Sequence, residues 1–301
     1  MNDLVKLGRP KNFNDKLGVR MPNIRDRKLL SKKINDRELT RLSKNIRKNI
    51  LHMVHSTRSS HVGSAFSIVE ILIVLYKLVM KHDKKNHKDP DRDRLVLSKG
   101  HACAAMYAIL AELGYFNKKL LKEYSKNGSI MMSHINSEVP GVEFSTGSLG
   151  HGLPVALGMA IAAKNLKKKW RVFVVISDGE LNEGSNWEAF SLAGHLKIDN
   201  LYAIVDSNKL QATGFTKEII DLEPLSNKFK SFGWEVLRVN GHNFQNIYNK
   251  IKKLINSKNR KPKILIADTV KGKGVSFMEN ELSWHYRYPS EEEFNLCLKE
   301  I

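Results

Sequence analysis

The stretch RVFVVISDGE, residues 171–180, decides the fold class of this chain. Its centre is a continuous apolar run, and we predict a strand over residues 171–177 that is buried on both faces. The polar residues Asp178, Gly179 and Glu180 follow at once, so the strand ends in a turn. A strand that is covered on both faces needs a layer of helices on each side, which predicts an α/β architecture.

The same pattern recurs on both sides of this stretch. Short apolar runs alternate with longer segments of helical periodicity, which is the arrangement of βαβ units in a mostly parallel sheet with helices on both faces. The further predicted strands cover residues 94–98, 201–206, 234–239 and 263–270. The predicted helices before and between them cover residues 153–166, 187–196 and 244–257.

The sequence divides into a short arm and one domain. Residues 1–35 have no apolar periodicity and contain two glycines and two prolines, which predicts an extended basic arm. Helical periodicity begins at Asp36 and continues to about residue 55, and a last helix is predicted over residues 291–301. Because no repeat and no low-complexity linker interrupts the rest, we predict a single domain over residues 36–301.

The composition excludes several classes of protein. With 42% apolar residues among 301, the chain can bury a core and is not disordered throughout. The longest apolar run, residues 68–80, is shorter than the ~20 residues of a membrane span and contains Glu70 and Lys77, so we predict a buried helix and no membrane association. The N-terminus lacks the apolar core of a signal peptide. Cys103 and Cys297 give no zinc spacing and no disulfide framework, so we expect a cytoplasmic protein.

The chain is strongly basic, with 50 Lys and Arg against 31 Asp and Glu and a net charge of +19. Residues 1–48 hold 15 of these basic residues and only 5 of the acidic ones. A solvated basic surface is the commoner explanation, and the alternative is attraction for anions such as phosphorylated substrates or nucleic acid. No nucleic-acid motif accompanies the charge and aromatic residues are not interleaved with it, so we expect no nucleic-acid partner.

Polar residues follow the predicted strands, at the place where an open parallel sheet binds its ligands. Asp178 and Asn208 are thirty residues apart, each at the end of a buried strand. Their carboxylate and amide oxygens are hard ligands that suit Mg²⁺ or Ca²⁺, together with backbone carbonyls and phosphate oxygens. Gly179 lets a phosphate approach the backbone. Asp-Gly and Ser-Asn are also ordinary turn sequences, so either one alone would indicate only a turn.

A glycine-rich loop and four histidines add to these strand ends. The sequence STGSLGHG, residues 145–152, precedes a predicted helix, where it can cradle an anion or simply allow tight packing. The histidines lie in stretches rich in glycine or serine and have no metal-binding spacing, so they indicate a polar cavity without identifying its ligand. They are His61, His101, His134 and His285.

Together these segments resemble the transketolase family. The sequence SDGELNEG, residues 177–184, with Asn208 thirty residues after Asp178, is similar to the thiamine-diphosphate-binding signature. Further segments follow one another in the order of that family: RDRLVLSKGHA, STGSLGHGLPVALGMA, SDGELNEGSNWEA, FGWEV, NGH and VKGKG with a later SWH. The resemblance covers roughly residues 40–290 and is to the N-terminal part of full-length transketolases, or to the N-terminal subunit of split ones. It implies the thiamine-diphosphate-binding fold.

The resemblance also implies a role for each matching position. Asp178 and Asn208 would ligate Mg²⁺, or else Ca²⁺ or Mn²⁺, through their side chains, and Leu210 would do so through its carbonyl. Glu183 matches an acidic residue that faces the partner subunit beside the cofactor and takes part in catalysis. The residues implied to contact thiamine diphosphate are Ser64, His101, Gly147, Ser148, Leu149, Gly179, Glu183, Asn208, Lys271 and His285. The residues implied to hold donor-sugar hydroxyls and to assist proton transfer are His61, His134 and His285.

The chain departs from the family pattern at a few positions. Ser177 replaces a usual glycine, Ser207 replaces the asparagine of some members, and His151 replaces the commoner glutamine. After His285 the chain continues Tyr-Arg-Tyr instead of the more usual glycine. Because the metal ligands are intact, these departures bear on substrate preference more than on cofactor binding.

The implied reaction is reversible transfer of a two-carbon ketol unit from a ketose phosphate to an aldose phosphate. In this family a second, pyrimidine-binding domain supplies the glutamate that activates the cofactor, and no predicted element remains for it. We therefore expect a separate C-terminal subunit in a symmetric heterotetramer, with self-association across the cofactor-domain interface. Two alternatives stay open: another thiamine-diphosphate enzyme, such as deoxyxylulose-phosphate synthase or a 2-oxo acid dehydrogenase alpha chain, and a non-catalytic basic binding protein on the same fold. The segments around His101 and His285 favour transketolase.

Overall fold

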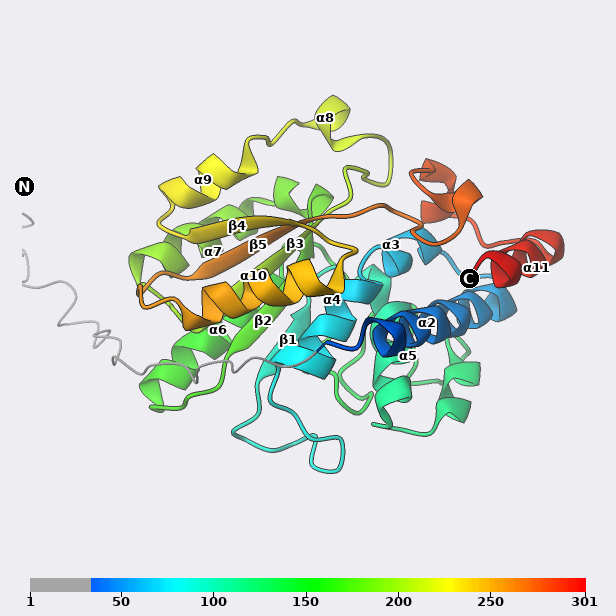
Figure 1. Ribbon diagram of the computed structural model, residues 1–301, viewed down its shortest axis with the longest axis horizontal. Helices are drawn as coiled ribbons and strands as arrows, with labels where there is room; N and C mark the ends of the chain where they lie inside the picture. The colour runs from blue at the N-terminus through cyan, green and yellow to red at the C-terminus, as the bar shows by residue number, and fades with distance from the viewer. Residues whose placement is uncertain (1–33) are drawn as a thin grey trace, which may run out of the picture.

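A computed structural model of the chain describes residues 34–301 (Figure 1). The basic arm predicted for residues 1–35 lies almost wholly outside the described residues. Within them, a parallel sheet is covered by helices on both faces, which confirms the predicted α/β fold class.

The sheet of the described residues has five strands, all parallel. They are β1 (Arg94–Leu97), β2 (Val172–Ser177), β3 (Leu201–Ser207), β4 (Glu235–Asn240) and β5 (Lys263–Asp268). Their order across the sheet is β1-β2-β3-β5-β4, so every strand predicted from an apolar run is present. Because all the strands are parallel, their carboxyl ends meet at one edge of the sheet.

Two layers of helices enclose the sheet. On one face lie α2 (Asp36–Thr57), α4 (Val69–Val74), α5 (Cys103–Leu113) and α10 (Phe244–Asn256). On the other face lie α6 (Gly152–Asn165), α7 (Gly184–His195) and α9 (Leu225–Ser231). Phe173 and Val175 of β2 enter the first core, whereas Val172 and Val174 enter the second. This burial on both faces is the reason that the apolar run of β2 is continuous.

The longest apolar run, residues 68–80, is buried, as predicted, but together with the residues just before it the run forms three short helical pieces. They are α3 (Val62–Phe66), α4 and a π-helical turn, η1 (Leu75–Val79). Taken together, Val62–Val79 is long and apolar enough to cross a membrane, with a mean hydropathy of 2.0. However, 94% of this segment is buried inside the protein, as in the core helix of a globular domain.

Shorter elements complete the described residues. The last helix, α11 (Glu291–Glu300), contacts α2 and begins with a capping box, in which Ser290 and Glu293 each accept a hydrogen bond from the other's backbone N–H. The remaining short helical segments are η2 (Gly100–Ala102), η3 (Lys118–Glu123), η4 (Gly179–Asn182), α8 (Thr216–Ile219), η5 (Ser276–Met278) and η6 (Leu282–His285).

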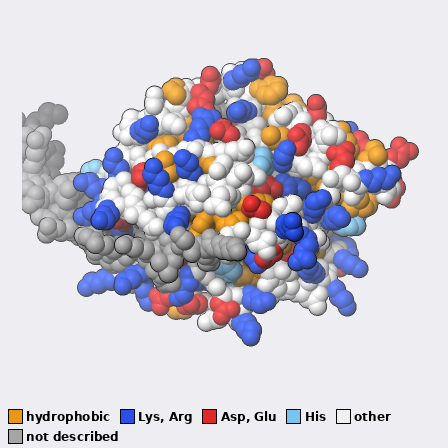
Figure 2. Space-filling model, in the orientation of Figure 1, with side chains coloured by type: hydrophobic (Ala, Val, Ile, Leu, Met, Phe, Trp, Pro, Cys, Tyr) orange, Lys and Arg blue, Asp and Glu red, His pale blue; other side chains and the backbone are white. Residues whose placement is uncertain are grey.

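On the face drawn in Figure 2, the positive charge of the described residues is spread out and not gathered in one place. Figure 2 shows Lys and Arg side chains across the whole visible face, with Asp and Glu side chains among them. This mixture is typical of a solvated basic surface, and it differs from the single basic stripe of a nucleic-acid-binding face.

A buried ion pair joins α2 to α4. Arg47 donates to both carboxylate oxygens of Glu70, at 2.7 and 3.0 Å, and to the carbonyls of Phe66 and Lys273. His242 contacts the same carboxylate through Nδ1 at 2.9 Å. Burial opposes ionisation, but Arg47 and His242 outweigh it and lower the pKa of Glu70 to about 2. The carboxylate is therefore charged at neutral pH, and Arg47 is the main group that stabilises this buried charge.

Removing Arg47 should destabilise the protein strongly, because Glu70 would remain as a buried charge without its main partner. We expect Arg47→Met to lower the free energy of unfolding by ~3–5 kcal/mol, measured by urea titration. The exposed Arg41 on the same helix offers a matched control, and Arg41→Met should stay within ~0.5 kcal/mol of wild type. Equal effects of the two substitutions would contradict this role of the pair.

Candidate active site

A cavity of about 260 Å³ lies at the carboxyl ends of the strands. Segments that are far apart in the sequence build it, from α3 to the region that follows β5. It brings together eleven of the predicted site residues: His61, Ser64, His101, His134, Gly147, Leu149, Gly179, Asn208, Leu210, Lys271 and His285. It adds residues that the sequence analysis did not assign to the site: Lys99, Ser177, Glu180, Gln211 and Ala212.

Four histidines cluster in this cavity. The ring centroid of His61 lies 5.1 Å from that of His101, 5.8 Å from that of His134 and 4.9 Å from that of His285. His61 precedes α3 with a φ of 73°, in the left-handed region, and its backbone N–H donates to the His285 carbonyl at 3.0 Å. This conformation is costly for a residue with a Cβ, and it holds the His61 ring among the other three.

The cavity keeps three of its histidines, His61, His101 and His285, neutral. Burial, with smaller effects of neighbouring histidines and of Lys99 and Lys271, lowers the pKa of His61 to about 4 and that of His285 to about 3. The pKa of His101 is also well below its ordinary value, mainly because of burial. Lys271 Nζ contacts His285 Nδ1 at 3.1 Å. Because an ammonium group can only donate, Nδ1 is the acceptor, and the neutral ring carries its proton on Nε2.

A buried carboxylate connects the segments below the cavity. Asp206, at the end of β3, accepts hydrogen bonds from Lys99 at 2.5 Å, from Ser67 at 2.8 Å, from Asn208 at 2.9 Å and from Thr269. Lys99 and these donors outweigh the effect of burial and lower the pKa of Asp206, so it is ionised. This network fixes the amide of Asn208, one of the predicted metal ligands.

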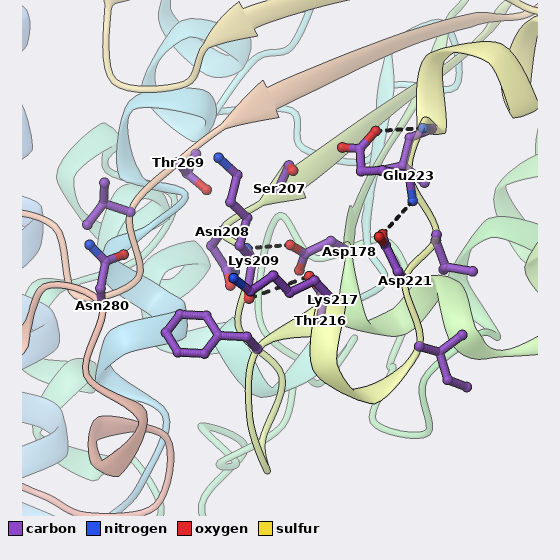
Figure 3. A pocket seen from close by; sticks show the side chains of 15 residues that line it. Asp178, Ser207, Asn208, Lys209, Thr216, Lys217, Asp221, Glu223, Thr269 and Asn280 are labelled. Carbon is purple, nitrogen blue, oxygen red and sulfur yellow. Dashed lines mark hydrogen bonds between the residues drawn. The ribbon is translucent and has the colours of Figure 1, made fainter.

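The predicted metal ligands lie on two adjacent loops (Figure 3). The carboxylate of Asp178 accepts from the backbone N–H of Gly179 at 2.9 Å and from that of Lys209 at 2.5 Å. Asn208 Oδ1 accepts from the backbone N–H of Leu210 at 3.0 Å. Backbone N–H groups therefore hold both side chains that would ligate a cation, and the N–H of Lys209 joins the Asp178 loop to the Asn208 loop.

The charge of Asp178 is poorly compensated within the chain itself. Burial, together with the nearby charge of Asp206, raises its pKa to about 7. A cation bound at this carboxylate would favour its ionised form. The donor set also suits a hard divalent ion, because it offers carboxylate and amide oxygens.

Three predicted residues lie outside the 260 Å³ cavity. Asp178 lines a neighbouring cavity of about 600 Å³, and Asn208 lines both. Ser148 lines a third cavity of about 420 Å³ beside the glycine loop. Glu183 is exposed at the N-cap of α7 and packs under Gly150 of that loop. The roles implied for these three residues stay predictions, as do the roles implied for the eleven residues that line the cavity.

Lys99 and Glu180 are site residues that sequence reasoning missed. Glu180 is fully buried and accepts from the backbone N–H of Gly150 at 2.9 Å and from Ser98 Oγ, so it ties the glycine loop to the strand ends. The available signal was position, since Lys99 follows the β1 run within two residues and Glu180 follows Asp178 closely. Lysine and glutamate in such turns are usually exposed to solvent, so nothing in the sequence indicated that Lys99 and Glu180 are buried in the site.

The cavity fits an anionic cofactor bound with a metal ion. A Cβ on Gly179 would lie 2.9 Å from the Gln211 side chain, so glycine leaves room for a group against the backbone. Gln211 Nε2 is a buried donor with no hydrogen-bond partner in residues 34–301, and it would suit a ligand oxygen. In the same residues no three His, Cys, Asp or Glu side chains form a metal cluster. A metal here would therefore share backbone and cofactor oxygens.

Comparison with known proteins decides the family. The family model described as "Transketolase, thiamine diphosphate binding domain" matches residues 39–297. The chain belongs to the transketolase family. It is 42% identical over 266 residues to one of the subunits of the apulose-4-phosphate transketolase of Actinobacillus succinogenes, covering 88% of this chain and 96% of that protein. It is 40% identical over 257 residues to a 6-deoxy-6-sulfo-D-fructose transketolase subunit of a Clostridium species, covering 85% and 93%.

Solved transketolase structures share the fold. The crystal structure of the Campylobacter jejuni enzyme superposes with a TM-score of 0.83 at 32% identity, over 88% of this chain and 43% of that one. The chain thus spans less than half of that transketolase but nearly all of the subunits named above. These matches confirm the predicted family, the thiamine-diphosphate-binding fold and a transferase subunit of the split type.

The raised pKa of Asp178 predicts a pH-dependent cost in the metal-free chain. Its folded-state pKa of about 7 exceeds the ordinary 3.8, so between these values the folded state holds a proton that the unfolded state has lost. This contribution to the free energy of unfolding therefore falls as pH rises from about 4 to about 7. Asp178→Asn cannot ionise. We expect the free energy of unfolding of this variant to rise by ~2–4 kcal/mol relative to that of wild type as the pH goes from about 4.5 to 8. Urea titrations in the presence of EDTA measure this difference.

The exposed Asp83 provides the control for this experiment. The free energy of unfolding of Asp83→Asn should change with pH in parallel with that of wild type over the same range. Comparing each variant with wild type cancels the effects of the other titratable groups, because these groups are present in every protein tested. If the difference in free energy of unfolding between Asp178→Asn and wild type did not change with pH, Asp178 would ionise normally and the prediction would be wrong.

Proposed function

We propose that this chain is the metal- and diphosphate-binding subunit of a split transketolase. Together with a separate C-terminal subunit, it transfers a two-carbon ketol unit from a ketose to an aldose. The observation that carries the proposal is the cavity at the strand ends, which combines four histidines, two buried lysines and the Asn208 amide. The transketolase matches favour this reaction over the other thiamine-diphosphate reactions and over a purely binding role.

The strand-end loops would hold the cofactor and its metal ion. Thiamine diphosphate, when bound, supplies the stabilisation of a carbanion that ketol transfer requires. Asp178, Asn208 and the carbonyl of Leu210 would ligate the ion, and Mg²⁺ suits such oxygen ligands. Gly179 and the loop at residues 147–149 would receive the diphosphate, because both leave backbone open to a bulky anion.

The histidines would act on the sugar. His285 offers Nε2–H as a donor to a sugar oxygen, since its Nδ1 accepts from Lys271. His61 is neutral and can accept a proton from a hydroxyl and return it during the reaction. The pKa of Lys271 is lowered to about 8 by burial and by the charge of Lys99, so at neutral pH it is mostly a cation. It therefore favours negative charge on nearby oxygens.

The partner subunit would close the cavity beside the glycine loop. Met132 and Phe144 are 53% and 38% exposed there, in the hollow that Ser148 and His151 also line. Exposed large apolar side chains with a polar rim mark protein contacts. We infer that the pyrimidine-binding subunit covers this surface, with Glu183 at its edge, and that two chains of each kind form a symmetric assembly.

Anionic sugars, in particular sugar phosphates, are the proposed substrates. One relative is named for apulose 4-phosphate and another for 6-deoxy-6-sulfo-D-fructose, and both names describe sugars with an anionic group. Lys99 and Lys271 make the cavity attractive to such groups. Tyr286 is 60% exposed and its ring lies 4.9 Å from that of His285, so it would narrow the access to the cavity where other members have glycine.

Reconstitution tests the proposed function. The purified chain should bind thiamine diphosphate with Mg²⁺, seen as a saturable rise in melting temperature, but should show no ketol transfer alone. Transfer should appear when the C-terminal subunit is added, in a coupled assay with a ketose phosphate and an aldose phosphate. Asp178→Ala mixed with the same subunit is the control and should stay inactive. Transfer by the isolated chain would refute the need for a partner.

Substituting the sugar-side histidines should separate catalysis from cofactor binding. We expect His134→Ala and His285→Ala to lower kcat of the reconstituted enzyme by ~10²–10⁴-fold, because each removes a positioned hydrogen-bonding or proton-transfer group. The Kd for thiamine diphosphate with Mg²⁺, measured by calorimetry, should change much less. His195→Ala, on the exposed side of α7, should leave kcat as in wild type. Unchanged turnover in both site variants would remove these histidines from the reaction.

A further inference from the structure

The 600 Å³ cavity next to the cofactor cavity has the proposed metal ligands Asp178 and Asn208 in its lining, and the rest of its wall has no role in the function proposed above (Figure 3). Residues 215–225, which include α8, form one wall, and the ends of β3 and the segment after β5 form the other. The two cavities meet at Asn208, which lines both. A void of this size at the strand ends can hold an organic molecule.

Much of the cavity wall is apolar. Phe215, Ile220, Leu222, Leu225 and Val270 contribute side chains to it. Phe215 and Ile220 are 43% and 53% exposed, so this apolar surface faces water in the absence of a ligand. Removing apolar surface from water contributes ~25 cal/mol per Å², so the wall favours a ligand with an apolar body.

Asp178, Asp221 and Glu223 are the acidic residues of the wall. Asp178 accepts hydrogen bonds from the backbone N–H groups of Gly179 and Lys209. Asp221 and Glu223 are compensated by the wall itself. Asp221 accepts a hydrogen bond from the backbone N–H of Glu223 at 2.9 Å. Glu223 accepts from the backbone N–H of Leu225 at 2.7 Å and pairs with Arg238 at 3.0 Å. These carboxylates therefore hold the loop in shape, and they add little free negative charge to the cavity.

The lysines of the wall are not compensated in this way. Lys209 and Lys217 both line the cavity, and neither ammonium group has an ion-pair or hydrogen-bond partner in the part of the chain that the structure describes. Figure 3 shows the Lys209 side chain extending toward Thr269 and the Lys217 side chain extending back toward Asn208. Lys209 also has a φ of 64°, a conformation that usually favours glycine, so a strained backbone carries one of the two cations.

We propose that this cavity is a second ligand site, which binds a small organic anion with an apolar body. The anionic group lies between Lys209 and Lys217, and the apolar part packs on Phe215, Ile220 and Leu222. Because Asn208 lines both cavities, occupation of this site changes the affinity for the metal and the cofactor, and the reverse holds equally. The site itself does not depend on the ketol transfer proposed above.

A fluorescent anion tests the site directly on the full chain. The probe is anilinonaphthalene sulfonate, which joins a sulfonate to an apolar ring system. We expect one saturable site in a fluorescence titration. The uncharged analogue phenylnaphthylamine should bind at least about tenfold more weakly, because it lacks the charge-assisted contacts. No saturable site, or equal affinity for both probes, would overturn the proposal.

Variants place the probe in the cavity. Lys217→Gln and Lys209→Asn, in which asparagine tolerates the positive φ, should each weaken sulfonate binding several-fold, and the double variant at least about tenfold. Leu222→Trp, which fills the cavity, should abolish binding.

The exposed Lys122→Gln is the matched control and should bind as wild type does. Wild-type affinity in the double variant would show that the probe sits elsewhere, for example at Met132, and would refute the site. Lys217 is exposed, so its substitution alone gives a result even if another variant fails to fold.

Discussion

The ion pair between Lys99 and Asp206 is the constraint on which the site depends. Both side chains are fully buried and lie 2.5 Å apart. Charges without water are stable only when they are paired and hydrogen-bonded, so the chain surrounds Asp206 with further donors. Ser67 brings the end of α3 to it, Thr269 brings the segment after β5, and Asn208 brings its own loop. The donors that stabilise the buried Asp206 carboxylate thus come from several distant segments, and this brings together segments that carry site residues.

The electrostatics of the site follow from the same pair. Lys99 and Lys271 make the interior of the cavity cationic, which helps burial to keep His61, His101 and His285 neutral. Asp178 is the exception, a carboxylate whose charged form is disfavoured. A cationic cavity favours an anion, and a disfavoured carboxylate favours a cation. A diphosphate that shares a metal ion with the protein, as proposed above, would meet both requirements together.

Much of this arrangement could be predicted from the sequence. The strands were visible because burial on both faces makes their apolar runs continuous, and eleven site residues were predicted because parallel strands and a family resemblance place them at one edge. Lys99, Glu180 and Gln211 were missed, since the burial of a polar side chain depends on partners from distant segments. The 600 Å³ cavity was missed for the same reason, because it arises from the path of residues 215–225 over the strand ends.

The apolar segment Val62–Val79 has a consequence for the synthesis of this protein. It leaves the ribosome before β2, β3 and β5, whose side chains later cover it. The nascent chain therefore carries, for a time, an uncovered segment that a membrane or another unfinished chain could receive. Glu70 within it makes insertion into a bilayer costly, by ~2.5–3.5 kcal/mol for a charge at the centre. Its partner Arg47 has already been made, so early pairing of α2 with α4 directs the segment into the folding domain.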